Sequence, residues 1–227
     1  MTFAENIIQF YKHLFLDVSL PEGIRVLNPI QESKEVRATF SAFYRKFYSD
    51  NHTRHLILGI NPGRLGAGAT GIPFTDPKRL KSHCGIESSF NLHEPSSVFV
   101  YELIDAYGSP ESFYQTFYIS SVCPLGFVQV NDRGREVNYN YYDSSALTEA
   151  VTPFIVETIQ SQLDFGIYHD KVFCLGTGKN YHFLQKLNEE HKFFGEVVPL
   201  EHPRYVMQYK SKQKQQYIDK YLRTLSD

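Results

Sequence analysis

A glycine-rich stretch, Gly66 to Gly71, is the first arrangement of residues in this sequence that suggests chemistry. Its letters, GAGATG, match the G-x-G-x-x-G pattern with which dinucleotide-binding loops hold a pyrophosphate at a helix N-terminus. That pattern needs its first glycine in the turn that leaves a strand and its last where a helix packs on the sheet. Here Gly66 comes several residues after the apolar run 55–60, and Pro73 disfavours a helix after Gly71. We therefore expect no nucleotide cofactor, and keep a nucleotide-cofactor enzyme as the weakest alternative.

The elements that would position such a loop follow from hydrophobic periodicity. Short apolar runs typical of buried strands cover residues 55–60, 116–122, 171–175 and 195–200. Helical patterns cover residues 7–14, 36–47, 96–107, 143–163, 179–190 and a C-terminal segment, with Asp143 as the expected N-cap of the fourth. Strands separated by helices predict an α/β fold, a three-layer α/β/α sandwich with a central four-stranded, mainly parallel sheet. We expect one domain over residues 1–227, with N-terminal helices in 1–50 and a C-terminal helix in 208–227.

Ligands of open parallel sheets bind in the crevice beyond the carboxyl ends of the strands. The segments that follow the four expected strands begin at Asn61, Cys123, Gly176 and Glu201. These four loops should therefore converge on one site.

The composition excludes several classes of protein. The chain has 227 residues, is 42% hydrophobic and carries a formal net charge of −2. No apolar run is long enough to cross a membrane, and the N-terminal residues lack the pattern of a secretion signal. Its three cysteines are far apart and form no C-x-x-C pair, so we expect neither a metal site nor an iron–sulfur cluster. Three unpaired thiols fit a reducing compartment, and we expect a cytoplasmic protein.

The segment from Gly59 to Phe74, GINPGRLGAGATGIPF, resembles the first active-site motif of the uracil-DNA glycosylase superfamily. The motif of its single-strand-selective monofunctional (SMUG-like) branch has the form G-x-N-P-G-x-x-G-x-x-x-T-G-x-P-F, and every fixed position is present. Val122 to Leu125, Leu175-Gly176 and His202-Pro203 resemble later family elements in the same order. The resemblance runs from about residue 55 to 207 and indicates a divergent bacterial member.

This resemblance implies a reaction and a partner. Members flip a damaged base out of DNA, because the bond to be broken is inaccessible within the stack, and hydrolyse its N-glycosidic bond. The product is an abasic site. No cofactor or metal is implied, the partner is DNA that carries a damaged or deaminated base, and we expect a monomer.

The resemblance also assigns roles to individual residues. Asn61 matches the asparagine that positions the attacking water, and His202 matches the histidine that donates a hydrogen bond to O2 of the departing base. Phe74 matches the phenylalanine that stacks on that base. The residues expected around the substrate base are Gly59, Ile60, Pro62, Gly63, Phe74, Ser120, Ser121 and Cys123. Those expected to contact DNA are Arg64, Gly68, Thr70, Arg204, Tyr205, Val206, Met207 and Lys210.

Two positions depart from the family pattern in a way that bears on specificity. Ser121 stands where the family has an asparagine that reads the uracil edge, and a rotating hydroxyl is less selective than a fixed amide. Gly63 stands where a related branch has a bulky aromatic residue, although a glycine needed only for backbone conformation is the plainer interpretation. Together they predict a roomier pocket that accepts deaminated purines, xanthine first and hypoxanthine second, beside or instead of uracil.

The region after His202 departs as well, because the family's H-P-S-P-R-N-P continues here as HPRYVMQY. The residue that would wedge into the DNA stack is therefore open. A second reading of the chain also stays open, namely a catalytically impaired DNA- or nucleotide-binding module on the same fold. Asp76 and Asp132 are further candidates for assisting the water.

Overall fold

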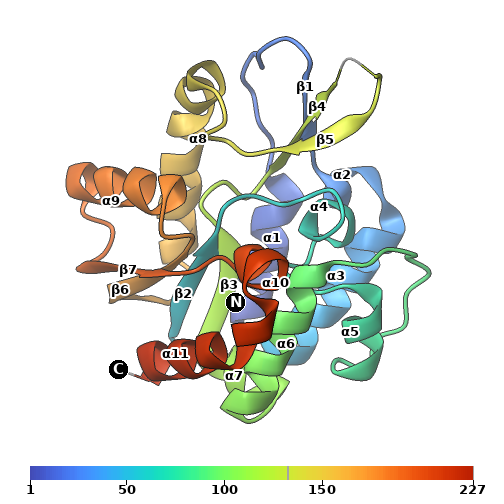
Figure 1. Ribbon diagram of the computed structural model, residues 1–227, viewed down its shortest axis with the longest axis vertical. Helices are drawn as coiled ribbons and strands as arrows, with labels where there is room; N and C mark the ends of the chain where they lie inside the picture. Colours follow the sequence, from blue (N-terminus) through green and yellow to red (C-terminus); the bar gives the residue numbers. More distant parts are fainter. Residues whose placement is uncertain (132, 227) are drawn as a thin grey trace.

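The computed structural model describes residues 1–131 and 133–226 (Figure 1). Its central sheet consists of β2 (Arg54–Gly59), β3 (Phe117–Ser121), β6 (Ile167–Leu175) and β7 (Glu196–Leu200). The strand order is β3-β2-β6-β7 and every pair is parallel. The predicted four-stranded sheet is thus confirmed, and β6 begins four residues before the expected run at Lys171.

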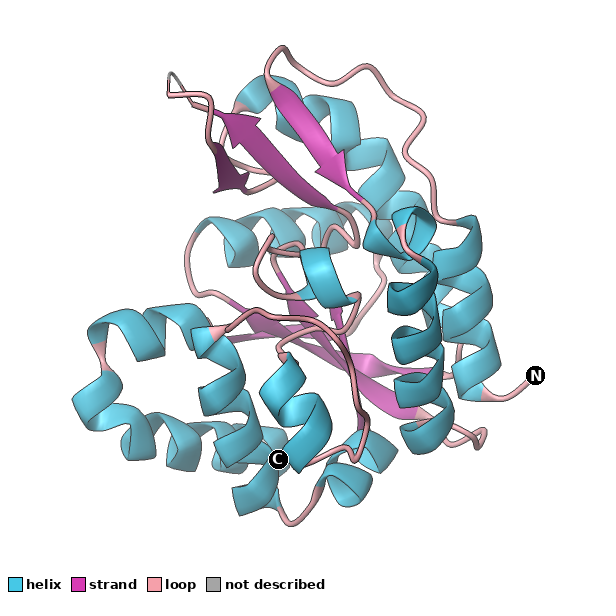
Figure 2. Ribbon diagram, turned by 90° about the vertical axis from the view of Figure 1, so that its right-hand side faces the viewer, coloured by secondary structure: helices cyan, strands magenta, loops and turns pink. Residues whose placement is uncertain are grey.

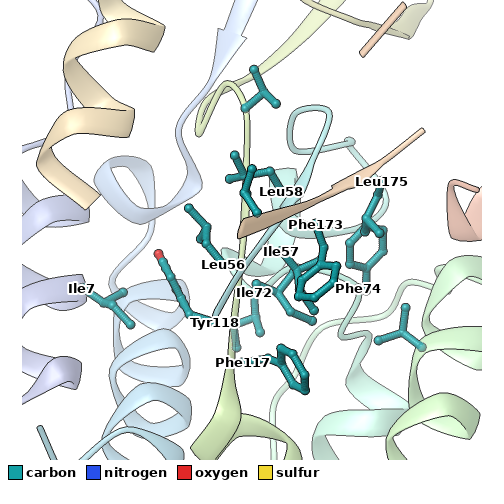
Figure 3. Close-up of a cluster of buried hydrophobic side chains, with 14 of the residues drawn as sticks. Ile7, Leu56, Ile57, Leu58, Ile72, Phe74, Phe117, Tyr118, Phe173 and Leu175 are labelled. Atoms are coloured by element: carbon teal, nitrogen blue, oxygen red, sulfur yellow. The ribbon is translucent and has the colours of Figure 1, made fainter. Parts of the chain in front are cut away.

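Helices cover both faces of this sheet. The α-helices of the described residues are α1 (Phe3–His13), α2 (Pro29–Glu32), α3 (Lys34–Phe47), α4 (Ala67–Thr70), α5 (Pro77–Ser82), α6 (Pro95–Tyr107), α7 (Pro110–Thr116), α8 (Ser145–Leu163), α9 (Lys179–His191), α10 (Pro203–Tyr209) and α11 (Lys214–Ser226). Successive side chains of a strand point to opposite faces. Tyr118 on one face of β3 therefore meets α1 and α3, whereas Phe117 on the other meets α6 and α7 (Figure 3). This arrangement is the predicted three-layer α/β/α sandwich.

A second, smaller sheet was not predicted. It consists of β1 (Ile24–Leu27), β4 (Gly126–Val130) and β5 (Glu136–Tyr139), antiparallel in the order β1-β4-β5. Figure 2 shows it apart from the central sheet, at the end where the loops after β2 and β3 lie. Gly126 fixes the approach of this sheet to the loop after β2, because a Cβ there would lie 2.2 Å from the carbonyl oxygen of Pro62. Residues 1–50 therefore hold a strand as well as helices.

Two helix boundaries correct the sequence-based expectations. Ser144, not Asp143, caps α8 by accepting the N–H of Leu147. The segment after His202, for which no helix was expected before residue 208, forms the helix α10 with Pro203 in its first turn. None of the helices in the described residues is long and apolar enough to span a membrane.

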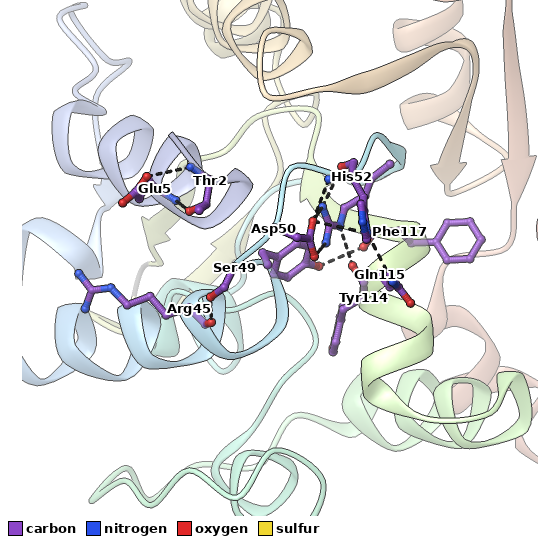
Figure 4. Close-up of polar contacts among 11 residues, drawn as sticks. Thr2, Glu5, Arg45, Ser49, Asp50, His52, Tyr114, Gln115 and Phe117 are labelled. Carbon is purple, nitrogen blue, oxygen red and sulfur yellow. Dashed lines mark hydrogen bonds and ion pairs between the residues drawn. The ribbon is translucent and has the colours of Figure 1, made fainter.

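The amino ends of the central strands are held by a buried arginine. The Arg54 guanidinium, with its side chain 0% exposed, donates to the carbonyl of Tyr114 at 2.7 Å and to the carboxylate of Asp50 at 2.9 Å. Figure 4 shows Asp50 and Tyr114 converging here. Burial alone would raise the pKa of Asp50, but hydrogen bonds from Arg54 and His52 outweigh it and lower the pKa. This cluster anchors the end of the sheet opposite to the site described next.

Candidate active site

Asn61 follows β2 after one intervening residue, and both halves of its carboxamide are held by backbone. Its Nδ2 donates to the carbonyl of Tyr139 at 3.2 Å, and its Oδ1 accepts the N–H of Tyr141 at 3.1 Å. The two contacts fix the orientation of the amide, since exchanging its oxygen and nitrogen would lose both. The side chain is half-buried, so one lone pair of Oδ1 and one N–H of Nδ2 remain for a water molecule or a ligand.

His202 follows β7 and is the N-cap residue of α10. Its Nδ1 accepts the backbone N–H of Arg204 at 3.1 Å. Because an accepting Nδ1 carries no proton, the proton of the neutral ring is on Nε2, which is then a donor. Burial, with the positive charge of Arg204 nearby, lowers the pKa of His202 to about 4. At neutral pH this residue is an uncharged hydrogen-bond donor in a fixed tautomer.

Phe74 brings an aromatic surface against that imidazole. The two ring centroids lie 5.7 Å apart with an interplanar angle of 61°. Phe74 has a φ of 51°, a left-handed conformation that is unfavourable for a bulky residue and is often found at functional sites. In Figure 3 the ring lies near Phe173 and Leu175, beyond the ends of the central strands.

Two small residues, Gly59 and Ser121, lie next to the ring of Phe74. A Cβ at Gly59 would lie 3.6 Å from Cζ of Phe74 and 3.5 Å from Oγ of Ser121. The end of β2, the end of β3 and the stacking ring therefore meet at one point. This placement supports the assignment of Gly59 and Ser121 to the base pocket.

Gly63 is not required by the backbone. Its φ lies outside the left-handed region, and a Cβ there would make only ordinary contact, with the Asn138 amide at 3.5 Å. The Oδ1 of Asn138 accepts the N–H of Arg64 at 2.9 Å, which fixes this amide at the mouth of the site. The absent side chain at Gly63 thus leaves room for a Cβ in ordinary contact with Asn138.

A cavity of about 270 Å³ adjoins His202. Its lining comes from the loops after β2, β5, β6 and β7 and from the first turns of α9 and α10, namely Ile60, Tyr142, Gly176, Thr177, Gly178, Lys179, Asn180, Glu201, His202 and Tyr205. Three of the four loops predicted to converge therefore share one cavity. The fourth, which holds Cys123, is joined to Ile60 by a backbone hydrogen bond of 3.1 Å. The Cys123 side chain is 0% exposed and belongs to the core, where burial raises the pKa of its thiol to about 12.

Gly68 of the glycine-rich loop was expected to contact DNA. The loop instead turns its glycines toward the protein. A Cβ at Gly68 would lie 2.7 Å from the carbonyl oxygen of Gly63, and one at Gly66 would lie 2.5 Å from the Glu94 carboxylate. Gly68 is thus required by its packing against backbone, whereas at Gly66 the end of the Glu94 side chain would have to move. Thr70 is also misassigned to DNA, because it is fully buried and its hydroxyl bonds to the loop's own backbone, including Ile72. A one-turn helix, α4, lies within the loop and ends at Gly71, and no helix follows Gly71 before α5.

Two more expected contacts are wrong for reasons of side-chain direction. Ser120 alternates with Ser121 on β3, so its hydroxyl points to the opposite face and lies near Tyr11 and Tyr118. It cannot touch a base stacked on Phe74. Val206 is 0% exposed and belongs to the core, so it is not a wedge.

The exposed surface of α10 lies next to His202. Arg204 and Tyr205 are exposed there, Met207 is partly buried against the core and Lys210 is half-buried at the helix C-cap. Tyr209 is 66% exposed, and its ring centroid lies 5.6 Å from that of Tyr205. Tyr209 was not among the residues expected to contact DNA, although its spacing of four from Tyr205 would have placed it on the same helix face.

The two acidic candidates have different outcomes. Asp76 is fully buried, caps α5 through the N–H of Arg79, and also accepts from His93. It is thereby committed to the scaffold. Asp132 lies outside the described residues. No group of three or more potential metal ligands occurs among residues 1–131 and 133–226.

The fold and the geometry of this site together define a class of protein. The model of the uracil DNA glycosylase superfamily matches residues 45–226, and the chain belongs to that superfamily. It is a DNA glycosylase of the monofunctional type, an enzyme that hydrolyses N-glycosyl bonds.

The particular resemblance is to the SMUG-like branch. The crystal structure of wild-type SMUG2 from Pedobacter heparinus matches with a TM-score of 0.97 and 56% sequence identity. The match covers 100% of this chain and 97% of that one. A comparison with curated proteins finds no match.

Proposed function

We propose that this protein removes uracil from DNA by hydrolysing the N-glycosidic bond of a flipped nucleotide, in base-excision repair. The observation that carries the proposal is the imidazole of His202, whose Nδ1 accepts the N–H of Arg204 and whose ring packs edge-on against Phe74. A base stacked on that ring would place its O2 against a fixed donor. Such a donor stabilises the negative charge that gathers on the base as the bond breaks.

The chemical step follows from these groups. The oxygen of a water molecule forms a bond to C1′, and the C1′–N bond breaks with its electron pair passing to the base. The proton that the water loses is taken up by the departing base. Asn61 is too weak a base to deprotonate the water early, so its fixed carboxamide orients the water while His202 lowers the barrier by stabilising the leaving group.

We propose further that xanthine, and after it hypoxanthine, are substrates of the same pocket. Gly63 supports this because the structure offers no backbone reason for glycine there and leaves space beside Asn138. Ser121 supports it because a hydroxyl at the pocket floor lacks the paired donor and acceptor of an amide. A purine base needs the additional room that these two residues leave.

The surface of α10 is the proposed wedge, with Arg204 and Tyr205 entering the DNA and Met207 supporting them. Arg64 on the other side of the pocket and Lys210 at the end of α10 are proposed to hold phosphates. We propose that the protein works as a cytoplasmic monomer on chromosomal DNA. The assembled Asn61 and His202 favour an active enzyme over an impaired binding module.

Labelled oligonucleotides that contain uracil, xanthine, hypoxanthine or 5-hydroxymethyluracil test the proposal. Each is incubated with protein in single- and double-stranded form and then treated with alkali, which breaks the strand at an abasic site. Cleavage at uracil supports the main reaction. A xanthine oligonucleotide left intact beside efficient uracil cleavage would refute the broader specificity.

A further inference from the structure

A buried hydrogen-bond chain connects Asn61 to the far side of the cavity. Asn61 is held by the backbone of Tyr139 and Tyr141. The phenol of Tyr141 donates to Oδ1 of Asn180 at 2.8 Å. The Nδ2 of Asn180 donates to the carbonyl of Leu175 at 3.0 Å, at the end of β6. One continuous chain thus joins the residues after β2, β5 and β6.

The burial of this chain indicates that it is a rigid support. Tyr141 is 0% exposed and Asn180 is 1% exposed. Burial raises the pKa of the Tyr141 phenol far above its ordinary value, so the group stays a neutral donor at every relevant pH. A buried acceptor that loses its donor retains the full cost of having been removed from water. The Tyr141 hydroxyl and the Asn180 carboxamide therefore stabilise each other in one arrangement.

A second contact fixes the same segment from the other side. The hydroxyl of Thr148 on α8 lies 3.0 Å from the carbonyl oxygen of Tyr141 and 2.9 Å from that of Ser144, so the two carbonyls share one donor. The backbone N–H of Tyr141 that contacts Asn61 is thereby held between a side-chain anchor and a helix. Without the phenol anchor, the segment at Tyr141 would keep only this shared contact on the side of α8 and would be held less firmly relative to the end of β2.

We propose that Tyr141 and Asn180 are positioning residues, which act on the reaction by holding the Asn61 carboxamide in the orientation that places the attacking water. Neither residue is assigned a reacting atom. The inference rests on the proposed function, since it concerns the water that Asn61 orients. A displacement of about 1 Å at such a position can slow a reaction by about a hundredfold.

The test compares Tyr141→Phe and Asn180→Ala with Tyr48→Phe. Tyr48 is the matched control, because it is 1% exposed and its hydroxyl donates to the carbonyl of Phe117 at 3.1 Å, at the opposite end of the sheet. Single-turnover rates on a uracil oligonucleotide are measured at saturating enzyme, on samples whose circular dichroism shows that they are folded. Tyr141→Phe and Asn180→Ala should slow the chemical step at least about tenfold, with little change in the enzyme concentration for half-maximal rate.

Two results would overturn the inference. One is a Tyr141→Phe rate equal to that of Tyr48→Phe. The other is an equal loss from Tyr141→Phe when Asn61 is already alanine, because the phenol would then act independently of Asn61.

A readout without catalysis separates this inference from the proposed function. The side-chain amide signal of Asn61, identified by its loss in Asn61→Ala, is observed by ¹⁵N NMR. It should shift or broaden in Tyr141→Phe and Asn180→Ala but not in Tyr48→Phe. An unchanged signal in Tyr141→Phe would overturn the inference. A wild-type protein that cut no substrate would refute the proposed function, while this signal would still decide the positioning role.

Discussion

The Nδ1 of His202 accepts the backbone N–H of Arg204 at 3.1 Å, and this single contact decides what the imidazole can do. The bond places the ring proton on Nε2, the atom left free to meet a substrate. The same two residues also set the charge of the ring, because the guanidinium of Arg204 adds to the effect of burial on its pKa. Helix capping and leaving-group stabilisation are therefore two consequences of one geometry.

His202 should remain neutral over the whole range in which the enzyme is active. Its pKa of about 4 predicts a rate–pH profile without an inflection near 6.5, and an NMR titration of its Hε1 signal should be flat from pH 9 to 6. Arg204→Gln should raise the pKa, since it removes a nearby positive charge. An Hε1 titration midpoint between 6 and 7 in the wild-type protein would contradict this assignment.

The lowered pKa of His202 also makes the free energy of unfolding depend on pH. The unfolded chain takes up a proton at the ordinary pKa of histidine, about 6.5, whereas the folded protein does so only at about 4. His202 therefore lowers the free energy of unfolding as the pH falls through this window, and its effect levels off below it. Urea unfolding of wild type and His202→Gln should show the wild type losing more stability between pH 6.5 and 4.

Gly63 and Gly68 should respond oppositely to alanine. Gly63→Ala should change the free energy of unfolding by no more than about 0.5 kcal/mol, because its Cβ has room. Gly68→Ala would force a Cβ to 2.7 Å from a carbonyl oxygen and should lower the free energy of unfolding by more than about 1 kcal/mol, as overpacking does.

Gly63→Phe should reduce xanthine cleavage more than uracil cleavage. Equal losses on both bases would show that the space beside Asn138 does not set specificity.

The buried cluster at the opposite end of the sheet should control stability and not catalysis. Arg54→Met removes the donors to the carbonyls of Tyr114 and His52 as well as the partner of Asp50, whose side chain is 34% exposed, and should cost at least about 2 kcal/mol in the free energy of unfolding. Arg25→Met removes an ion pair with Glu136 in which both side chains are over 40% exposed, and should cost about 1 kcal/mol or less. Urea unfolding gives both values. Similar losses would show that burial of the arginine contributes little.

Tyr205 is the residue on α10 that should contribute most to DNA binding. Stacking on a base is worth about 1–3 kcal/mol, so Tyr205→Ala should weaken binding of an abasic or uracil oligonucleotide about tenfold. Tyr168, which is 45% exposed at the far end of β6 compared with 42% for Tyr205, is the matched control. Fluorescence anisotropy at fixed salt measures both, and equal affinity of the two variants would remove Tyr205 from the interface.

The sequence predicted the central sheet because its strands are short, continuous apolar runs with helices between them. It also located Asn61, Phe74 and His202, because a contiguous motif and the ends of strands are properties of the chain itself. The small sheet was missed: β5 reads EVNY, and its four residues, the first three of them exposed, are too few for an alternating pattern to stand out. The direction of a side chain was missed for a related reason, since a motif matches positions and does not say that Thr70 or Val206 faces inward.

The partners of Asn61 could not have been found from the sequence. They are backbone groups of Tyr139 and Tyr141, 78 and 80 residues further along the chain, and backbone groups leave no signal in residue type. Asn180 carries no signal either, because an asparagine in the first turn of a helix is common. These contacts emerge only when the ends of β2, β5 and β6 are brought together in space.

The central claim is that this site hydrolyses the N-glycosidic bond of uracil through Asn61 and His202. Its most direct test is the rate of abasic-site formation in a uracil oligonucleotide by wild type, Asn61→Ala and His202→Ala, at enzyme concentrations that saturate the DNA. Wild type should cleave the oligonucleotide, and the rates of both variants should be lower by about 10²–10³-fold with binding retained. A wild-type protein that leaves the oligonucleotide intact, or variants that cut as fast as wild type, would contradict it.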